Sequence, residues 1–319
     1  MKRTRILSAS LALVAAAALA ACGSSGSSGK AANTGGNGSS APAAAQSTFP
    51  SQPGSIVVGS ADFPENQLLA LIYGDAMAAK GVKVTQRPNI GERSVYMTAL
   101  QDGSIDFIPE YSGSILAYLD STATAKSPAD VYTALQTVAA SKGLVALKYA
   151  AAQDSDTITV TKATADKYHL SSIADLQPIA ANLTFGAPAQ FQTRPDGIPA
   201  LKSVYGVVFG TFTPLKAGGT FTVTALQDGS VQAADVFSTD PAMKKYGFVA
   251  LKDPKSMFAA QNIVPIAKAG KISQPAVNAC NAVSAKLDTA TLLDLVSQVA
   301  GGADPATVAT QWLASVGLG

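Results

Sequence analysis

A run of seven residues occurs twice in this chain, and the repeat constrains the fold more strongly than any other sequence feature. Residues 98–104 read TALQDGS, and residues 224–230 read the same seven letters 126 positions later. In each copy a helical segment ends at a glycine, the favoured residue after a helix C-terminus, and a turn then leads into a short apolar strand. Two such copies predict two similar α/β lobes within one chain.

An aromatic residue stands just beyond the predicted strand of each copy. Tyr111 follows the strand expected over residues 105–108, and Phe237 follows the strand expected over residues 231–236. Ligands of open α/β sheets bind at the carboxyl ends of strands, and pockets form preferentially between domains. The pattern therefore predicts a ligand cleft between the lobes with both aromatics in it. The alternative interpretation is that both rings belong to ordinary hydrophobic cores.

Strands and helices alternate in the rest of the chain beyond residue 54. Residues 56–58 are expected to form a strand, and Asp62 and Pro64 are expected to provide the N-cap and first turn of the helix that follows. Ser127 marks the start of a further helix in the same way. This alternation is typical of an α/β fold with a largely parallel sheet.

The first 54 residues have the composition of an export signal followed by a tether. Basic residues precede an apolar run over 6–21, and Cys22 directly follows small residues in a pattern that resembles a lipobox. We expect residues 1–21 to be removed and Cys22 to be lipidated, which anchors the protein at the extracytoplasmic face of the cell membrane. An ordinary secretory signal is the alternative. Residues 22–54 are rich in Gly, Ser and Ala and predict a flexible tether.

Charge and residue usage make several functional classes unexpected. Lys and Arg number 23 and Asp and Glu number 21, and because three basic residues lie in the signal segment the remainder is close to neutral. Nucleic acid is therefore not an expected partner. Cys280 is the one other cysteine, which leaves no pair for an intramolecular disulfide. The single histidine, His169, makes neither a catalytic triad nor a metal cluster, so we expect a non-enzyme without metal or cofactor.

Segments spread over residues 55–319 together resemble the substrate-binding proteins of ABC transporters for glycine betaine, choline and related osmoprotectants, the ProX-like family. In chain order the segments are residues 59–63 (GSADF), 103–106 (GSID), 109–113 (PEYSG), 183–186 (LTFG), 194–197 (RPDG) and 237–240 (FSTD). The resemblance implies the type II periplasmic binding protein fold, in which two Rossmann-like lobes close on a ligand. It assigns residues 55–153 and 262–319 to lobe 1 and residues 154–261 to lobe 2.

The resemblance also implies which residues contact the ligand. Members of the family enclose a quaternary ammonium with aromatic rings, while an arginine or backbone donors bind the ligand carboxylate. Tyr111 and Phe237 match aromatic walls of this cage, and Ser114 matches a hydroxyl position beside Tyr111. Asp154 matches a polar or acidic position at the cation, and Arg194 matches the carboxylate-binding arginine.

Three further positions depart from the family pattern. Asn66 stands where glutamine is frequent, and Asp156 and Gln261 stand where a cage tyrosine is frequent. The predicted pocket is therefore more polar and more acidic than the family pattern. Such a pocket favours a cation that carries hydrogen-bond donors, or a polyhydroxylated or larger ligand.

The predicted function is that of a monomeric extracytoplasmic solute-binding lipoprotein. It is expected to bind a small osmoprotectant such as glycine betaine or choline and to deliver it to the permease and ATPase subunits of an ABC importer. Two alternatives stay open. The same fold can bind a different polar or aromatic small molecule, because the aromatic cage is incomplete. An extracellular hydrolase or transferase on the same scaffold is the less favoured alternative.

Overall fold

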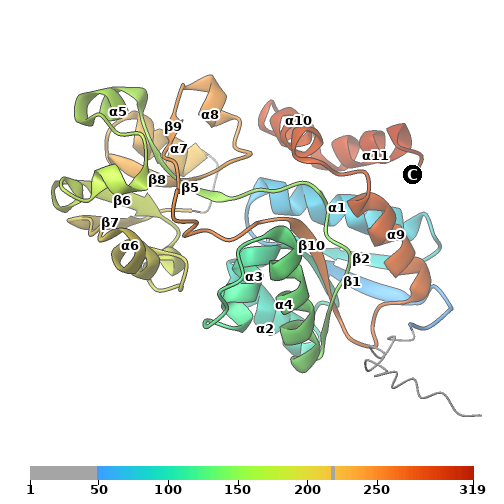
Figure 1. The fold of residues 1–319 in the computed structure, drawn as a ribbon. Helices are drawn as coiled ribbons and strands as arrows, with labels where there is room; N and C mark the ends of the chain where they lie inside the picture. Colours follow the sequence, from blue (N-terminus) through green and yellow to red (C-terminus); the bar gives the residue numbers. More distant parts are fainter. Residues whose placement is uncertain (1–48, 217–219) are drawn as a thin grey trace, which may run out of the picture. The chain divides into compact units, whose positions relative to one another are not determined.

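The computed structural model describes residues 49–216 and 220–319, which form two α/β lobes joined by two crossing segments (Figure 1). The predicted signal segment, the predicted lipidation site Cys22 and most of the predicted tether lie outside the described residues. Within the described ranges, no helix is both long enough and apolar enough to cross a membrane. The two-lobed α/β architecture confirms the fold class expected from the repeat.

Lobe 1 is built on a five-stranded mixed sheet. Its strands are β1 (Ser55–Gly59), β2 (Lys83–Arg87), β3 (Phe107–Tyr111), β4 (Leu144–Ala146) and β10 (Ile263–Lys268). They lie in the order β2-β1-β3-β10-β4. The strands β2, β1 and β3 are parallel, whereas β10 runs antiparallel to both of its neighbours.

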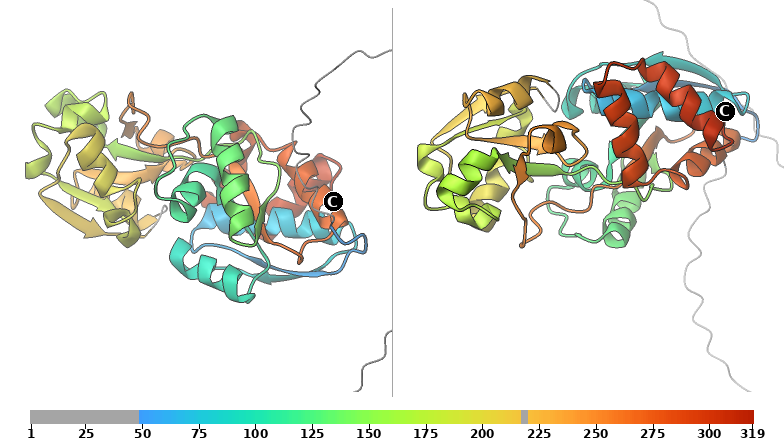
Figure 2. Two further views of the ribbon diagram at one scale, coloured as in Figure 1. Left: turned by 60° about the horizontal axis from the view of Figure 1, so that its bottom comes forward. Right: turned by 90° about the horizontal axis from the view of Figure 1, so that it is seen from above.

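Helices cover both faces of the lobe 1 sheet. They are α1 (Pro64–Ala78), α2 (Arg93–Asp102), α3 (Ser112–Leu119), α4 (Pro128–Ser141), α9 (Gln274–Ser284), α10 (Thr289–Ala300) and α11 (Pro305–Ser315). The C-terminal helices pack with α1 over one face, as Figure 2 shows, and α2, α3 and α4 enclose the core on the other. Phe107 and Ile108, adjacent in β3, therefore belong to different cores, as the alternation of side chains along a strand requires.

Lobe 2 has a second five-stranded mixed sheet in the order β7-β6-β8-β5-β9. Its strands are β5 (Asp156–Val160), β6 (Thr184–Ala187), β7 (Thr211–Pro214), β8 (Ala233–Phe237) and β9 (Val249–Ala250). Its helices are α5 (Lys162–Tyr168), α6 (Ile198–Tyr205), α7 (Thr220–Gln227) and α8 (Ala242–Lys245). The strands β7, β6 and β8 are parallel, and β5 runs antiparallel to β8 and β9.

The expectation of a largely parallel sheet holds for four of the five strands in each lobe, and one interior strand of each sheet runs the other way. The chain enters β5 and β10 directly after crossing between the lobes. Asp156, the first residue of β5, pairs with Phe237 at the end of β8, and Ile263, the first residue of β10, pairs with Tyr111 at the end of β3. A strand that begins at the carboxyl end of its neighbour must run antiparallel to it.

The two crossing segments, between β4 and β5 and between β9 and β10, are hydrogen-bonded to each other. Gln153 and Asn262 form an antiparallel bridge, and the Asp154 N–H donates to the Gln261 carbonyl at 3.1 Å. The lobes are therefore linked by a short paired ribbon rather than by two independent strands of chain.

The repeated heptapeptide has the same local structure in both lobes. Residues 98–104 end α2 before β3, and residues 224–230 end α7 before β8. Gly103 and Gly229 have φ angles of 85° and 79°, which lie in the left-handed region that glycine adopts without strain. In both copies the aspartate before the glycine accepts a hydrogen bond from the N–H of the serine after it, at 2.7 and 2.9 Å. The identical sequence thus encodes the same turn into the strand that follows, β3 in lobe 1 and β8 in lobe 2.

The predicted helix starts were confirmed at Ser127 and corrected at Asp62. Ser127 caps α4 by accepting a hydrogen bond from the Asp130 N–H at 3.2 Å. The N-cap of α1 is Phe63, which makes no side-chain cap, and not Asp62. Pro64 occupies the first helical position, where its fixed φ angle suits a helix start, so the cap falls one residue later than predicted.

The last residues of the predicted tether contact lobe 1. Phe49 packs against the lobe 1 core, the Pro50 carbonyl accepts from the Gln274 N–H at 2.8 Å, and the Pro53 carbonyl accepts from the Ser273 hydroxyl at 2.6 Å. The tether was therefore predicted to extend too far, because the aromatic side chain of Phe49 packs against an apolar surface beside α9.

Candidate ligand-binding site

A cavity lies between the lobes, and we call it the interlobe cleft. Its lining comprises Ala61, Asp62, Phe63, Glu92, Arg93, Tyr96, Tyr111 and Ser114 from lobe 1, Asp154 and Gln261 from the crossing segments, and Asp156, Pro188, Gln190, Arg194, Asp235 and Phe237 from lobe 2. The structure brings seven of the eight predicted site residues to this lining. The exception is Asn66.

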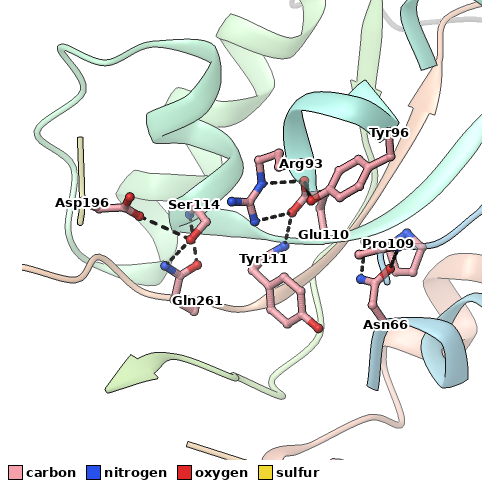
Figure 3. Close-up of polar contacts among 10 residues, drawn as sticks. Asn66, Arg93, Tyr96, Pro109, Glu110, Tyr111, Ser114, Asp196 and Gln261 are labelled. Atoms are coloured by element: carbon pink, nitrogen blue, oxygen red, sulfur yellow. Dashed lines mark hydrogen bonds and ion pairs between the residues drawn. The ribbon is translucent and has the colours of Figure 1, made fainter. Parts of the chain in front are cut away.

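Asn66 is buried behind the cleft and holds the backbone around it. Its side-chain oxygen accepts from the Ala61 N–H at 2.8 Å, and its side-chain nitrogen donates to the Pro109 carbonyl at 2.9 Å (Figure 3). Both bonds fasten the start of α1 to the neighbouring strand ends. In this arrangement Asn66 positions the cleft wall and does not line it.

Three aromatic rings meet where the two lobes face each other. The ring of Phe63 lies 6.0 Å from that of Tyr111 and 5.3 Å from that of Phe237, measured between ring centroids. Phe63 was not assigned to the aromatic cage from the sequence. Its position directly before Pro64, between the end of β1 and the start of α1, was the available signal. With Tyr96, which also lines the cleft, the lining has four aromatic residues instead of the two predicted.

A buried network of carboxyl and hydroxyl groups joins Tyr111 to lobe 2. Glu65 accepts from the Tyr111 hydroxyl at 2.8 Å and from the Thr239 hydroxyl at 2.5 Å. Asp154 accepts from the Thr239 N–H at 3.0 Å and from the Ser238 hydroxyl at 3.1 Å. The network spans both lobes, because Glu65 belongs to α1 and Thr239 follows β8.

Burial shifts the pKa values of the acidic groups in this network. It raises the pKa of Glu65, and it raises the pKa of Asp154 well above the ordinary value, with the neighbouring charge of Glu65 acting in the same direction. The carboxyl group of Asp154 is also a neighbour of Glu65, and this contact acts against burial by lowering the pKa of Glu65. The hydrogen bond between Glu65 and the Tyr111 hydroxyl was not expected from the sequence.

Arg93 reaches the cleft from lobe 1 with its charge already paired. Its Nε and Nη2 donate to the two oxygens of Glu110 at 2.9 and 3.1 Å, which is a bidentate ion pair (Figure 3). Glu110 also accepts from the Tyr96 hydroxyl at 2.8 Å and from the Tyr111 N–H at 3.0 Å. This fully buried carboxylate therefore fixes the backbone of Tyr111 at the end of β3.

Arg194, the predicted carboxylate-binding residue, is paired with two carboxylates of lobe 2. Its Nη2 forms an ion pair with Asp156, and its Nε lies 3.0 Å from the nearer oxygen of Asp196. Its guanidinium also stacks on the Phe191 ring at 4.4 Å. Asp156, expected to replace a cage tyrosine, thus lies at the cleft as the partner of Arg194.

Ser114 and Gln261 are joined by two hydrogen bonds. The Ser114 N–H donates to the Gln261 side-chain oxygen at 3.0 Å, and the Gln261 side-chain nitrogen donates to the Ser114 hydroxyl at 2.9 Å. The Ser114 hydroxyl donates in turn to Asp196 of lobe 2 at 3.4 Å (Figure 3). These hydrogen bonds link the crossing segment between β9 and β10, which contains Gln261, to the start of α3.

Asp235 is a further acidic residue of the cleft that the sequence interpretation missed. It lies in β8 two residues before Phe237, so both side chains point to the same face of the strand. Its side chain is 1% exposed, and neither of its oxygens receives a hydrogen bond from a donor among the described residues. Burial, and then the charge of Asp156, raises the pKa of Asp235 well above the ordinary value.

The charges of the cleft favour a cationic ligand. Five carboxyl groups line it, those of Asp62, Glu92, Asp154, Asp156 and Asp235. Its two guanidinium groups are each held in ion pairs with protein carboxylates. The aromatic faces add the negative potential of their π-systems.

Two α/β lobes that enclose an aromatic and acidic cleft have the architecture of an extracytoplasmic solute-binding protein. The chain belongs to the OpuAC family, the substrate binding domain of ABC-type glycine betaine transport systems, whose model matches residues 54–315. The fold and the family confirm the predicted class and the predicted absence of an enzymatic function.

Relatives agree with this assignment. The glycine betaine-binding protein YehZ of Escherichia coli (strain K12) is 30% identical over 288 residues, which cover 86% of this chain and 94% of the relative. The solved structure of apo YehZ from the same species has a TM-score of 0.58 at 27% identity, and covers 83% of this chain and 99% of that chain. The crystal structure of a glycine betaine/carnitine/choline ABC transporter has a TM-score of 0.63 at 24% identity, and covers 82% of this chain and 99% of that chain.

Proposed function

We propose that this protein binds a small methylated ammonium solute, of the class of glycine betaine and choline, in the interlobe cleft and delivers it to the permease and ATPase subunits of an ABC importer. The observation that carries the proposal is the convergence of Phe63, Tyr111 and Phe237 at an acidic cavity. A methylated cation is held by aromatic faces, by dispersion and by nearby carboxylates, at about 0.5 to 2 kcal/mol per ring.

Two further points support this ligand class. The relative YehZ is a glycine betaine-binding protein by name, and it matches this chain over almost its whole length. The proposed ligand contacts are the rings of Phe63, Tyr111 and Phe237 together with the acidic groups of Asp154 and Asp156. In this proposal Ser114, Gln261 and Asn66 hold in place the backbone that carries these contact residues.

A thermal-stability screen of the purified protein tests the proposal. A ligand present at 100 times its Kd stabilises the folded state by about 2.7 kcal/mol, which raises the melting temperature measurably. Glycine betaine, choline, carnitine and proline betaine are expected to raise it, while an uncharged polyol such as sorbitol serves as the control. No rise with any methylated ammonium compound contradicts the proposal.

A different polar or aromatic cation is the second candidate ligand. It is favoured by the excess of carboxyl groups over free cationic groups in the cleft. A rise in melting temperature only with such compounds would keep the transport function and change the substrate.

We also propose that Cys22 is acylated and anchors a monomeric protein to the outer face of the cell membrane. The support is the sequence around Cys22, in which small residues follow an apolar run. Cys22→Ser is expected to move the protein from the membrane fraction to the soluble exported fraction. Mass spectrometry of the mature N-terminus, and the sedimentation of the released form, check the acylation and the monomeric state.

A further inference from the structure

Asp235 occupies an unusual position in the interlobe cleft. It is one of the most buried carboxyl groups of the described chain, at 1% exposure, and it belongs to the cavity lining. The cross-strand register places Asp156 opposite Phe237, so Asp235 is the diagonal neighbour of Asp156 on the same face of the sheet. Its carboxyl group and the Phe237 ring therefore lie on the same face of β8 and line the same cavity.

Among the described residues, no N–H group, hydroxyl group, lysine or arginine donates a hydrogen bond to Asp235. Its hydrogen-bonding neighbour is another acid, the carboxyl group of Asp156. The nearby guanidinium of Arg194 is within ion-pair distance of Asp156 and Asp196, and its described ion pairs do not include Asp235. Buried carboxylates in proteins are ordinarily paired or hydrogen-bonded, so an acceptor left open at a cavity wall indicates a donor on the ligand.

A quaternary ammonium cannot be that donor. Its four carbon substituents leave no N–H, so it can approach Asp235 as a diffuse charge but cannot donate a hydrogen bond to it. A tertiary or secondary ammonium differs in one respect: its methyl groups can contact the aromatic rings while its remaining N–H points at a carboxylate. The side of the cleft that carries Asp235 therefore suits a tertiary or secondary ammonium better than a quaternary one.

We propose that Asp235 accepts a charge-assisted hydrogen bond from an N–H of the bound cation, so that the preferred solute is a partly methylated ammonium that retains a proton. This inference rests on the proposed function, because it specifies the chemistry of the ligand in the same cleft. Asp235 is then the residue that distinguishes an N–H cation from its fully methylated counterpart.

Two matched pairs of compounds test this directly. N,N-dimethylglycine and glycine betaine differ by one methyl group on nitrogen, as do N,N-dimethylethanolamine and choline, and the nitrogen of all four compounds is positively charged at neutral pH. Isothermal titration calorimetry on the wild-type protein is expected to give about 10- to 100-fold tighter binding of the N–H member of each pair, the range of one charge-assisted hydrogen bond. Asp235→Asn keeps the shape of the side chain, removes its charge, and is expected to reduce the ratio at least tenfold.

Glu92→Gln is the matched control. Glu92 also lines the cleft, but it is partly exposed and accepts a hydrogen bond from Ser94. Removing its charge is expected to weaken both members of a pair by the same factor and to leave the ratio unchanged. A ratio that falls equally in Glu92→Gln and Asp235→Asn overturns the assignment to Asp235.

The remaining outcomes separate the inference from the proposed function. Equal binding within each pair, or tighter binding of the quaternary member, overturns the inference and leaves the proposed function standing. Binding of none of the four compounds overturns the proposed function and the inference with it. If Asp235→Asn does not fold, the wild-type ratio still decides whether the cleft prefers an N–H cation.

Discussion

The hydroxyl of Thr239 in lobe 2 donates a 2.5 Å hydrogen bond to the carboxyl group of Glu65 in lobe 1. Glu65 also holds the hydroxyl of Tyr111, so one buried carboxyl group sets the position of an aromatic wall and links the two lobes. Tyr111 and Asp235 are almost inaccessible in this arrangement, so we expect a ligand that contacts both to enter after the lobes separate and the bond between Thr239 and Glu65 breaks.

Thr239→Val is therefore expected to weaken ligand binding. Valine has the shape of threonine without the hydroxyl, so the closed arrangement loses one hydrogen bond while the Thr239 N–H contact to Asp154 is kept. Loss of such a bond lowers affinity by about 3- to 10-fold. Titration calorimetry with the best ligand of the screen measures it. Thr137→Val, on the exposed surface of α4, is the matched control, and equal affinities in the two variants would remove Thr239 from the closing contact.

Phe63→Leu is expected to weaken a methylated cation by about 3- to 30-fold, because one ring face contributes about 0.5 to 2 kcal/mol. Leucine fills much of the same volume, so the loss reports the aromatic face and not a cavity. Phe221→Leu provides the control, since Phe221 is 69% exposed and does not line the cleft. An unchanged Kd in Phe63→Leu would mean that the ligand does not contact this ring.

Arg194→Ala is expected to destabilise the fold by about 3 to 5 kcal/mol, because it leaves Asp156 and Asp196 without their cation in a largely buried site. Urea unfolding measures the change, and Lys162→Ala, which breaks an exposed pair with Asp166, is expected to change stability little. If Arg194 also binds the ligand carboxylate, the variant weakens glycine betaine more than choline. An equal effect on both ligands would mean that Arg194 stabilises lobe 2 and does not bind the ligand carboxylate.

The stability of the ligand-free protein is expected to depend on pH through Asp235. Because burial raises its pKa in the folded state above that in the unfolded chain, the folded state binds more protons between the two values. Stability conferred by the neutral form is thus present at about pH 4 and lost as pH rises, by at most about 1.4 kcal/mol per pH unit. As pH rises from 4 to 8, the melting temperature of Asp235→Asn is expected to increase relative to that of the wild type. Parallel curves would show that Asp235 does not titrate in this range.

Local patterns in the sequence were sufficient to predict the lobes. The repeated heptapeptide encodes the same turn twice, and Tyr111 and Phe237 lie at the ends of equivalent strands because the repeat fixes their spacing from that turn. These features depend on neighbours in the chain. For the same reason the antiparallel direction of β5 and β10 was missed, since strand direction depends on where the chain crosses between lobes.

Pairing between distant residues could not be read from the sequence. Arg194 is balanced by Asp156, which lies 38 positions away, and Asn66 is engaged by backbone groups on two sides. Asp235 did have a local signal, because it shares a strand face with Phe237, but nothing in the sequence indicates that it lacks a donor. The polar chemistry of the cleft therefore needed the three-dimensional arrangement.

The described chain starts and finishes on the same lobe. Phe49 and Leu318 both pack against the lobe 1 core, and the described backbone passes between the lobes through the paired ribbon around Gln153 and Asn262. Lobe 2 therefore contains neither end of the described chain, and two paired segments of backbone join it to lobe 1. A label attached near either end of the described chain therefore reports on lobe 1. The movement of lobe 2 is best followed with a probe attached within lobe 2 itself.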